Sequence, residues 1–211
     1  MLAVPETRIP KSEKAVAKRD RIIEKGFELM CENGYFKTST PDIAKAADVS
    51  TGIIYQYFKD KREIFIEGLK RFSDSVLFPM MDVLDSSDEN AAKIDLNDIE
   101  RMLDRLITLT VQSHRLTQKA HEELEMMAHA DEEVADIFKS SELTMTKKIS
   151  AFLEKNNIIL ENPIEKIHII YGLVENYCHE TVYHHHEGMN NEVMRSEVIK
   201  IVKNMVVGSI R

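Results

Sequence analysis

The stretch that most constrains this chain is Thr38–Lys61, with the sequence TSTPDIAKAADVSTGIIYQYFKDK. Thr40 is a suitable helix N-cap, and Pro41 follows at the first helical position, where its missing N–H costs nothing. The small or apolar residues that follow recur at helical spacing and would face inward: Ile43, Ala44 and Ala47. The pattern therefore predicts a short helix that begins at Pro41, with Thr40 as its N-cap.

A turn and a second short helix are expected next. Asp48-Val49-Ser50 is the predicted turn, and Ser50 would cap a helix from about Thr51 to Tyr57, with Ile54 and Phe58 on its inward side. Two short helices joined by a turn of three or four residues are the sequence form of the helix-turn-helix. The second helix of that motif enters the major groove of DNA.

Composition indicates that the rest of the chain is helical as well. The 211 residues include only 7 Gly and 5 Pro, apolar residues recur with a helical period, and alternation typical of strands is rare. No apolar run approaches the length of about 18–20 residues that crosses a membrane, and no signal peptide is recognisable. Cys31 and Cys178 form no motif and are expected to be reduced thiols. These features favour a cytoplasmic protein without a membrane partner.

Charge is divided unevenly along the chain. The net charge is −8, yet residues 1–62 carry 12 Lys/Arg against 9 Asp/Glu. The basic part coincides with the predicted helix-turn-helix, where phosphate contacts would be made, and DNA would repel the acidic remainder.

We expect about nine helices in two domains, residues 1–60 and 61–211. Residues 1–11 would form a flexible arm, followed by a helix from about Ser12 to Asn33 that Gly34 ends. The fourth helix, capped by Asp60 and Glu63, would stop before Pro79, and an acidic loop would follow over Asp82–Asn90. The remaining helices are expected at about 97–113, 116–130, 134–155, 163–183 and 191–207.

The segment Arg21–Phe65 resembles the TetR family of bacterial transcriptional regulators. The features that carry the resemblance are Gly34-Tyr35 after the first helix, Thr40 before Asp42-Ile43-Ala44, Val49-Ser50, Gly52, Tyr55, Phe58 and Lys61. Two positions depart from the family pattern. Gly26 stands where an alanine is usual, and Asp48 replaces the usual glycine of the turn, where aspartate tolerates a left-handed conformation.

The resemblance implies which residues contact DNA. Those expected to face the major groove are Thr51, Gly52, Ile53 and Gln56. Gln56 can pair with adenine, and Ile53 can contact a thymine methyl group. Those expected to contact phosphate are Thr40, Tyr55, Tyr57 and Lys61. The alternative for the two tyrosines is a place in the hydrophobic core.

The resemblance also implies a homodimer with a ligand pocket in each C-terminal domain. The last two helices would pair with their symmetry mates through Ile170, Val174, Tyr177, Val198, Ile201, Val202 and Met205. An unidentified small-molecule effector would contact Met102, Leu106, His114, His121, Met127, Met145 and Tyr171. Methionines at these spacings are also typical of a plain hydrophobic core.

The predicted function is a repressor that binds a palindromic operator and is released by its effector. One alternative is a constitutive DNA-binding dimer. Another is a helical metal-binding protein that uses His121, Glu125 and His129, which share a helix face. His179-Glu180 and His184 miss the H-E-x-x-H zinc spacing by one residue. We therefore predict no cofactor, no metal and no catalytic site.

Overall fold

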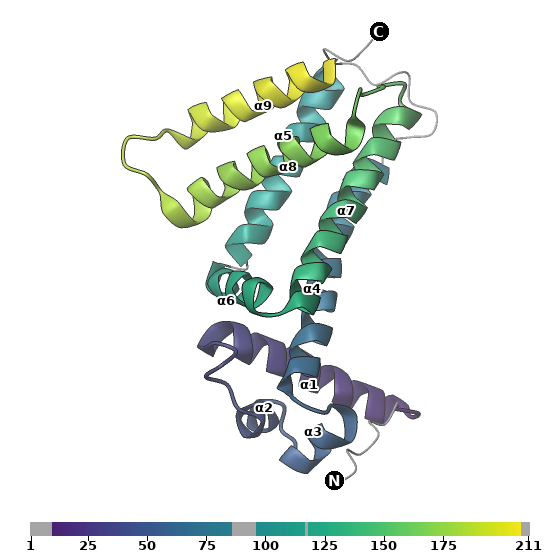
Figure 1. The fold of residues 1–211 in the computed structure, drawn as a ribbon, viewed down its shortest axis with the longest axis vertical. Coiled ribbons are helices and arrows are strands. Elements are labelled where there is room, and N and C mark those ends of the chain that lie inside the picture. The colour runs from purple at the N-terminus through teal and green to yellow at the C-terminus, as the bar shows by residue number, and fades with distance from the viewer. Residues whose placement is uncertain (1–9, 86–95, 117, 208–211) are drawn as a thin grey trace. The chain divides into compact units, whose positions relative to one another are not determined.

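The computed structural model describes residues 10–85, 96–116 and 118–207, and these residues are almost entirely helical (Figure 1). The α-helices are α1 (Glu13–Asn33), α2 (Thr40–Ala46), α3 (Thr51–Tyr57), α4 (Lys61–Asp85), α5 (Leu96–Leu116), α6 (Gln118–Ala130), α7 (Glu132–Lys155), α8 (Pro163–His179) and α9 (Asn191–Val207). A short π-helix, Glu180–His184, directly follows α8. The all-α class predicted from the sequence is confirmed.

The chain divides into two compact units that are not contiguous in sequence. Unit 1 comprises the chain up to Asp74 together with Lys119–Phe138, and unit 2 comprises Ser75–Gln118 together with the chain from Lys139 onward. This division differs from the boundary predicted after residue 60. The difference arises because α6 and the start of α7 contribute Leu124, Met127 and Val134 to the hydrophobic core of unit 1.

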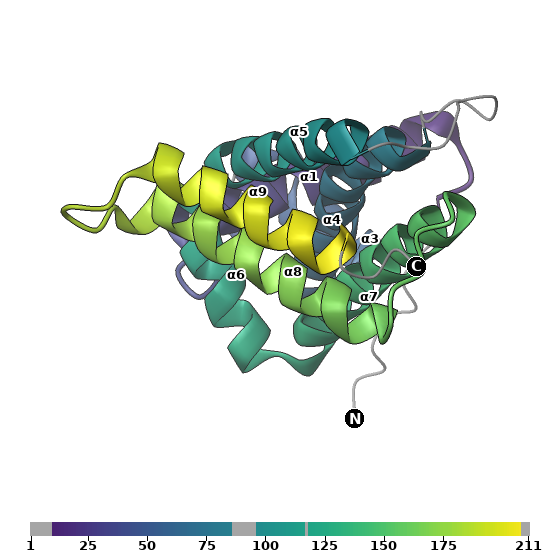
Figure 2. The same cartoon turned by 90° about the horizontal axis from the view of Figure 1, so that it is seen from above.

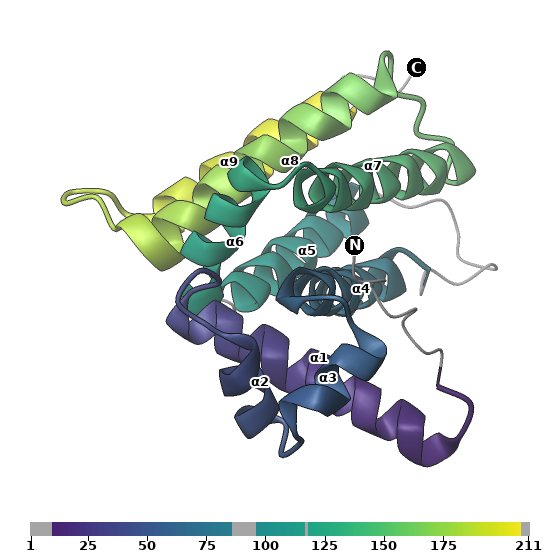
Figure 3. The same ribbon diagram turned by 60° about the horizontal axis from the view of Figure 1, so that its bottom comes forward.

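Unit 1 is built around α1, against which α2 packs, while α3 packs beside α2 (Figure 3). The side chains that fill its core include Ile22, Ile23, Met30, Ile43, Ile54, Phe58 and Phe65. Ser12 caps α1 by accepting a hydrogen bond from the backbone N–H of Ala15. Gly34 ends the helix with a φ of 99°, a conformation that glycine adopts without strain. Both ends of α1 therefore agree with the sequence prediction.

Helix α4 is longer than predicted. It continues through Pro79 and ends at Asp85, so the helix does not stop before the proline. Proline removes one backbone hydrogen bond and crowds the preceding turn, which bends a long helix without necessarily ending it. Of the predicted loop Asp82–Asn90, residues 82–85 are helical and residues 86–90 lie outside the described part of the chain.

Unit 2 contains α5, α8 and α9 in mutual contact, and α8 and α9 run side by side in Figures 1 and 2. Buried side chains from these helices and from α7 form one core, which includes Ile107, Phe152, Ile167, Cys178 and Val202. The observed bounds of α9 coincide with the predicted ones. Among the described helices, none is both long and apolar enough to cross a membrane.

Candidate functional site

Helix α2 begins one residue earlier than the sequence suggested. The N-cap is Ser39, whose hydroxyl accepts a hydrogen bond from the backbone N–H of Asp42, so Thr40 and Pro41 are the first helical residues. The Asp42 carboxylate accepts in return from the backbone N–H of Ser39 at 2.9 Å. This reciprocal pair is a capping box with aspartate in place of glutamate. Hydrogen bonds from Ser39 also lower the pKa of Asp42 below its usual value.

The turn between α2 and α3 is closed by backbone hydrogen bonds. The N–H of Asp48 donates to the carbonyl of Lys45 at 3.2 Å, and the N–H of Val49 donates to the carbonyl of Ala44 at 2.9 Å. Asp48 has a φ of 54°, which is left-handed. These bonds form a Schellman motif in which aspartate occupies the position that glycine usually takes. The turn predicted from the sequence is therefore confirmed.

Each helix of the motif has a buried side and an exposed side. The side chains predicted to face inward are all buried in the core of unit 1: Ile43, Ala44, Ala47, Ile54 and Phe58. On α3, Gly52 and Gln56 are exposed, and Tyr55 is 46% exposed. Since the core already holds Ile54 and Phe58, this outer side of α3 is free to contact a large ligand.

Three further predicted DNA-binding residues lie at the border between core and solvent. Ile53 and Tyr57 are partly buried and pack against the core of unit 1, while Thr51 is half-buried at the start of α3. Tyr57 is therefore partly the core aromatic that the alternative interpretation expected. Tyr55 is the more accessible tyrosine.

A small residue in α1 allows α2 and α4 to approach closely. An alanine Cβ at Gly26 would lie 2.7 Å from Cγ2 of Ile64 and 3.0 Å from Cγ2 of Ile43. Carbon atoms in van der Waals contact are about 3.5–4.0 Å apart, so any larger side chain must displace these two isoleucines. Gly26 thus helps to fix the position of α2.

The side chain of Lys61 forms its contacts within unit 1. Its ammonium group donates to the carbonyl oxygens of Tyr35 at 2.6 Å and Thr38 at 2.8 Å, and it lies 4.4 Å from the centre of the Tyr35 ring. Partial burial lowers the pKa of Lys61. The side chain therefore holds the loop between α1 and α2, and its predicted phosphate contact stays a prediction.

Sequence reasoning missed two acidic residues that support this part of unit 1. Glu123 of α6 accepts a hydrogen bond from the backbone N–H of Tyr35 at 2.5 Å. Asp131, just before α7, accepts from Nε and Nη2 of Arg62 at 2.5 and 2.8 Å. The bonded residues are 88 and 69 positions apart in the chain. No local sequence pattern could have revealed these pairs.

Unit 2 encloses a cavity of about 100 Å³. Its lining is almost entirely apolar and comes from α5, α7, α8 and α9. Four of the predicted pocket residues are among those that line it: Met102, Leu106, Met145 and Tyr171. The carboxylate residue of the lining is Glu175, which the sequence did not single out.

The remaining predicted pocket residues lie elsewhere. His114 is hydrogen-bonded through Nε2 to Glu175 Oε2 at 2.9 Å, so it contacts a lining residue without being among the lining residues. His121 and Met127 belong to unit 1, where Met127 is 2% exposed in the core. Met127 is therefore core, as the alternative interpretation expected, because α6 packs into unit 1.

The residues predicted for a dimer interface fall into two groups. Tyr177, Val198 and Val202 are buried in the core of unit 2, and Val198 is only 3% exposed. Ile170 and Val174 line the cavity. These five side chains face the interior of their own chain, which corrects their placement at an interface. Ile201 is 44% exposed, and Met205 is half-buried.

The outer side of α8 and α9 carries other apolar residues. Ile169 is 59% exposed on α8, and Val193 and Ile201 are exposed on α9. Gly172, also on α8, has no neighbouring atom within 4 Å of the position that a Cβ would occupy. The sequence periodicity correctly indicated that α8 and α9 are apolar. It selected mainly residues of their buried side for the interface, such as Ile170, whereas the neighbouring Ile169 is exposed.

The family model described as "Bacterial regulatory proteins, tetR family" matches residues 22–67. This range runs from α1 through both helices of the helix-turn-helix into α4. Within this range, the chain is similar to the DNA-binding segment of the TetR family of bacterial transcriptional regulators.

Curated relatives match a part of this chain of similar length. The chain is 45% identical over 58 residues to the HTH-type transcriptional regulator HbdR of Aromatoleum sp. (strain CIB), which is 28% of this chain and 25% of the relative. It is 44% identical over 50 residues to the fatty acid metabolism regulator protein of Bacillus subtilis (strain 168), 24% of this chain and 26% of that one. The chain thus spans about a quarter of the length of these curated relatives.

Solved structures of transcriptional regulators match the fold over nearly the whole chain. A protein described as a TetR-family transcriptional regulator from Mesorhizobium loti MAFF303099 has a TM-score of 0.75 at 16% identity and covers 93% of this chain and 98% of its own. A transcriptional regulator from Saccharomonospora viridis, solved in complex with choline, has a TM-score of 0.68 at 17% identity, over 89% and 96% of the two chains. At these identities the likeness concerns the fold.

Proposed function

We propose that this chain is a TetR-family regulator, a ligand-responsive repressor that binds a palindromic operator as a cytoplasmic homodimer. The observation that carries the proposal is the exposed side of α3, where Gly52, Tyr55 and Gln56 are accessible beside a rigid capped turn. In a helix-turn-helix this is the surface that lies in the major groove.

Each exposed residue of α3 has a distinct proposed role. Gly52 lets the DNA backbone or a base edge approach the helix closely, because no side chain intervenes. Gln56 pairs with adenine through its amide, and such a bidentate pair contributes about 1–3 kcal/mol of discrimination. Tyr55 donates its hydroxyl to a phosphate, which positions the protein without reading the sequence. Thr40, Thr51, Ile53 and Tyr57 flank this surface as secondary contacts.

A salt-titrated gel shift on DNA from upstream of the chain's own gene tests the proposal. We expect a specific complex at low salt, and Gln56→Ala should weaken it at one or two base pairs while leaving the salt dependence unchanged. Tyr55→Phe should weaken binding to all sequences alike. Gln112→Ala is the matched control, because Gln112 is exposed on α5 in unit 2. Absence of a specific complex at low salt would contradict the proposed function.

A homodimer is supported by the exposed apolar residues on α8 and α9. Ile169 and Ile201 are accessible, and the open space at Gly172 would let a partner helix approach closely. Dimers of helix-turn-helix proteins place their recognition helices about one DNA turn, roughly 34–36 Å, apart or a multiple of it. We therefore place the interface on this outer surface rather than on the buried residues Val198 and Val202.

Sedimentation of Ile169→Asp tests this interface. We expect monomers and loss of operator binding, because a charge in an apolar interface is not compensated. Ile159→Asp is the matched control, since Ile159 is 72% exposed outside both helices. Val198→Asp should instead destabilise unit 2 itself. An unchanged dimer in Ile169→Asp would refute the proposed interface.

The cavity of unit 2 supports an effector that is mainly apolar with one polar end. Its volume of about 100 Å³ is below the roughly 300 Å³ of a usual ligand pocket, so a larger ligand requires the lining helices to move apart. A ligand that binds the expanded state more tightly shifts the population toward it. Release from the operator follows if the expanded state spaces the two recognition helices differently.

Thermal shifts with short alkyl compounds test the cavity. The series should end in neutral, cationic and anionic groups, and choline belongs in it because one structural relative was solved with choline. Leu106→Trp should abolish any shift by filling the cavity. If no compound changes the melting temperature or operator binding, the alternative of a constitutive DNA-binding dimer is favoured.

A further inference from the structure

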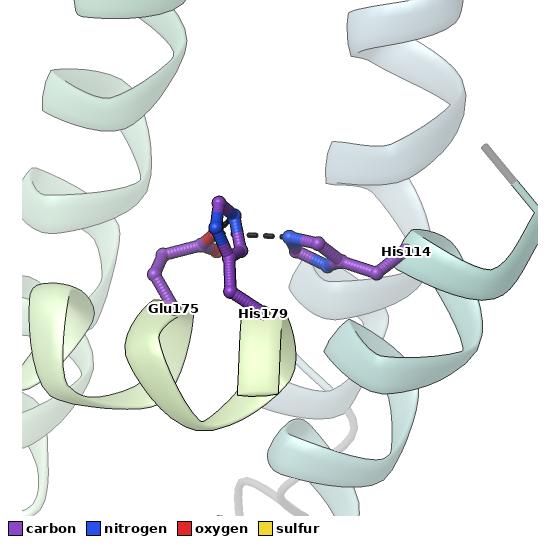
Figure 4. Close-up of side chains that lie close together, drawn as sticks. All are labelled: His114, Glu175 and His179. Atoms are coloured by element: carbon purple, nitrogen blue, oxygen red, sulfur yellow. Dashed lines mark hydrogen bonds and ion pairs between the residues drawn. The ribbon is translucent and has the colours of Figure 1, made fainter. Parts of the chain in front are cut away.

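Three side chains from two helices of unit 2 converge beside the cavity (Figure 4). His114 comes from α5, and Glu175 and His179 come from successive turns of α8. The Glu175 Oε2 atom lies 2.9 Å from Nε2 of His114 and 3.7 Å from Nε2 of His179. One potential ligand atom of each residue lies within 4.8 Å of the others, and all three side chains are partly buried.

The ring of His114 is placed between two hydrogen-bond acceptors. Its Nδ1 lies 2.9 Å from the carbonyl oxygen of Thr110, so Nδ1 must carry a proton. Its Nε2 faces the carboxylate of Glu175, which is also an acceptor when ionised. A neutral imidazole has only one N–H, so the contact between Nε2 and Glu175 needs either a proton, carried by one of these two groups, or a metal ion.

His179 approaches the same Oε2 atom of Glu175, and the centroids of the His114 and His179 rings lie 5.4 Å apart. Two imidazoles and one carboxylate are a ligand set of catalytic and regulatory zinc sites.

We propose that His114, Glu175 and His179 bind a divalent transition-metal ion, with Zn²⁺ as the best fit. In a tetrahedral zinc site with bonds of about 2.0–2.1 Å, ligand atoms lie about 3.3 Å from each other. The two distances to Glu175 Oε2 lie on either side of this value, so small side-chain movements suffice. The Thr110 carbonyl fixes the ring of His114 with Nε2 toward the ion, as outer hydrogen bonds do in known sites.

The proposed ion would have three protein ligands and therefore an open fourth position. Glu175 also lines the cavity, so this position borders the space in which a small molecule would bind. Water occupies it in the absence of a ligand, and an oxygen or nitrogen atom of a bound compound can replace the water. The proposal does not depend on DNA binding.

Metal titration of the untagged, full-length chain tests the site. After treatment with a chelator and dialysis, we expect one Zn²⁺ per chain by calorimetry, and Co²⁺ should give the visible absorption bands of a four-coordinate ion. His114→Ala, His179→Ala and Glu175→Gln should each weaken binding by more than the 10–100-fold that loss of a supporting residue costs. Affinity should also fall as pH decreases, because imidazole ligands must be deprotonated.

Two control variants test histidines elsewhere in unit 2. His168→Ala removes an imidazole that pairs with Glu142 in the same unit, and His185→Asn alters the exposed run His184–His186. Both should bind Zn²⁺ as the parent does, and circular dichroism should show every variant folded. Glu175→Gln, which preserves shape, keeps the test valid if an alanine variant unfolds.

Two kinds of result would overturn the proposed metal site. If the parent chain binds no Zn²⁺ or Co²⁺ at one equivalent, the cluster is an imidazolium–carboxylate ion pair and the proposal is overturned. Unchanged affinity in Glu175→Gln and His114→Ala, or a loss of affinity in His185→Asn, would place the binding elsewhere and overturn it as well. Operator binding by the metal-free chain, measured separately, would leave the proposed regulatory function intact.

Discussion

Gly68 of α4 lies close against Phe27 of α1. An alanine Cβ at this position would lie 2.4 Å from Cβ of Phe27, 2.5 Å from its Cγ and 2.7 Å from its Cδ2. The nearest of these atoms is Cβ, whose position is fixed by the backbone of α1. A change of rotamer at Phe27 therefore cannot relieve the contact, and the two helices must move apart.

The effect of Gly68→Ala on the free energy of unfolding combines two opposing contributions. Alanine is favoured over glycine in a helix by about 1 kcal/mol. Overpacking of a well-packed core costs about 1–3 kcal/mol, and a contact more than 1 Å too short belongs at the upper end. The clash also disturbs the contacts of the Phe27 ring with Phe65 and Phe72, whose ring centres lie 5.4 and 6.0 Å away. We expect Gly68→Ala to lower the free energy of unfolding by about 2 kcal/mol.

Thermal unfolding followed by circular dichroism measures the effect. For a chain of this size, a loss of 2 kcal/mol lowers the melting temperature by about 4–8 °C. Gly26→Ala is the matched comparison, because its Cβ would meet side-chain methyl groups of Ile64 and Ile43 rather than an atom fixed by the backbone. We expect Gly26→Ala to lower the free energy of unfolding by less than half as much as Gly68→Ala does. A Gly68→Ala variant as stable as the parent would refute the argument.

Three further predictions concern the supports of the helix-turn-helix. Lys61→Met removes two hydrogen bonds to the carbonyls that follow α1, so thermal unfolding should show a loss of about 2 kcal/mol, and an unchanged melting temperature would contradict this role. Asp48→Gly should be neutral or stabilising by up to about 1 kcal/mol, because glycine adopts a positive φ without strain; a clear fall in melting temperature would argue against the turn. The hydrogen bond from Arg62 holds the pKa of Asp131 below its ordinary value of 3.8, so the pair stabilises the fold above that pH and the contribution is lost as pH falls below it. Urea unfolding across a pH series should therefore show Asp131→Asn less stable than the parent at neutral pH, with the difference shrinking below about pH 3.8.

The helix-turn-helix could be predicted in detail because its determinants are local. Capping residues, the left-handed Asp48 and the inward positions Ile43 and Ile54 all follow from residues within a few positions of each other. The one local error, Thr40 in place of Ser39 as the cap, arose because both residues suit the position. Only the reciprocal hydrogen bonds between Ser39 and Asp42 distinguish them.

The C-terminal part could be predicted only as a set of helices. Periodicity located α9, yet it could not tell which apolar side faces the chain's own core, so Val198 was assigned to an interface. Glu175 was missed because its partner His114 lies 61 residues away. Likewise, Met127 belongs to unit 1 because α6 packs there, which is decided by tertiary contacts. Such pairings depend on the path of the chain rather than on spacing.

The proposed metal site and the proposed dimer interface share one helix, and this makes a coupling between them measurable. Ile169 and Glu175 lie six residues apart on the continuous helix α8, on different sides of it. A rotation or shift of α8 that adjusts Glu175 to an ion therefore also moves Ile169. By linkage, if Zn²⁺ tightens dimerisation by some factor, dimerisation must tighten Zn²⁺ binding by the same factor. We expect the Zn²⁺ affinity of the Ile169→Asp monomer to differ from that of the dimer, with Ile159→Asp as the control. Equal affinities in calorimetry would show that α8 does not transmit the change.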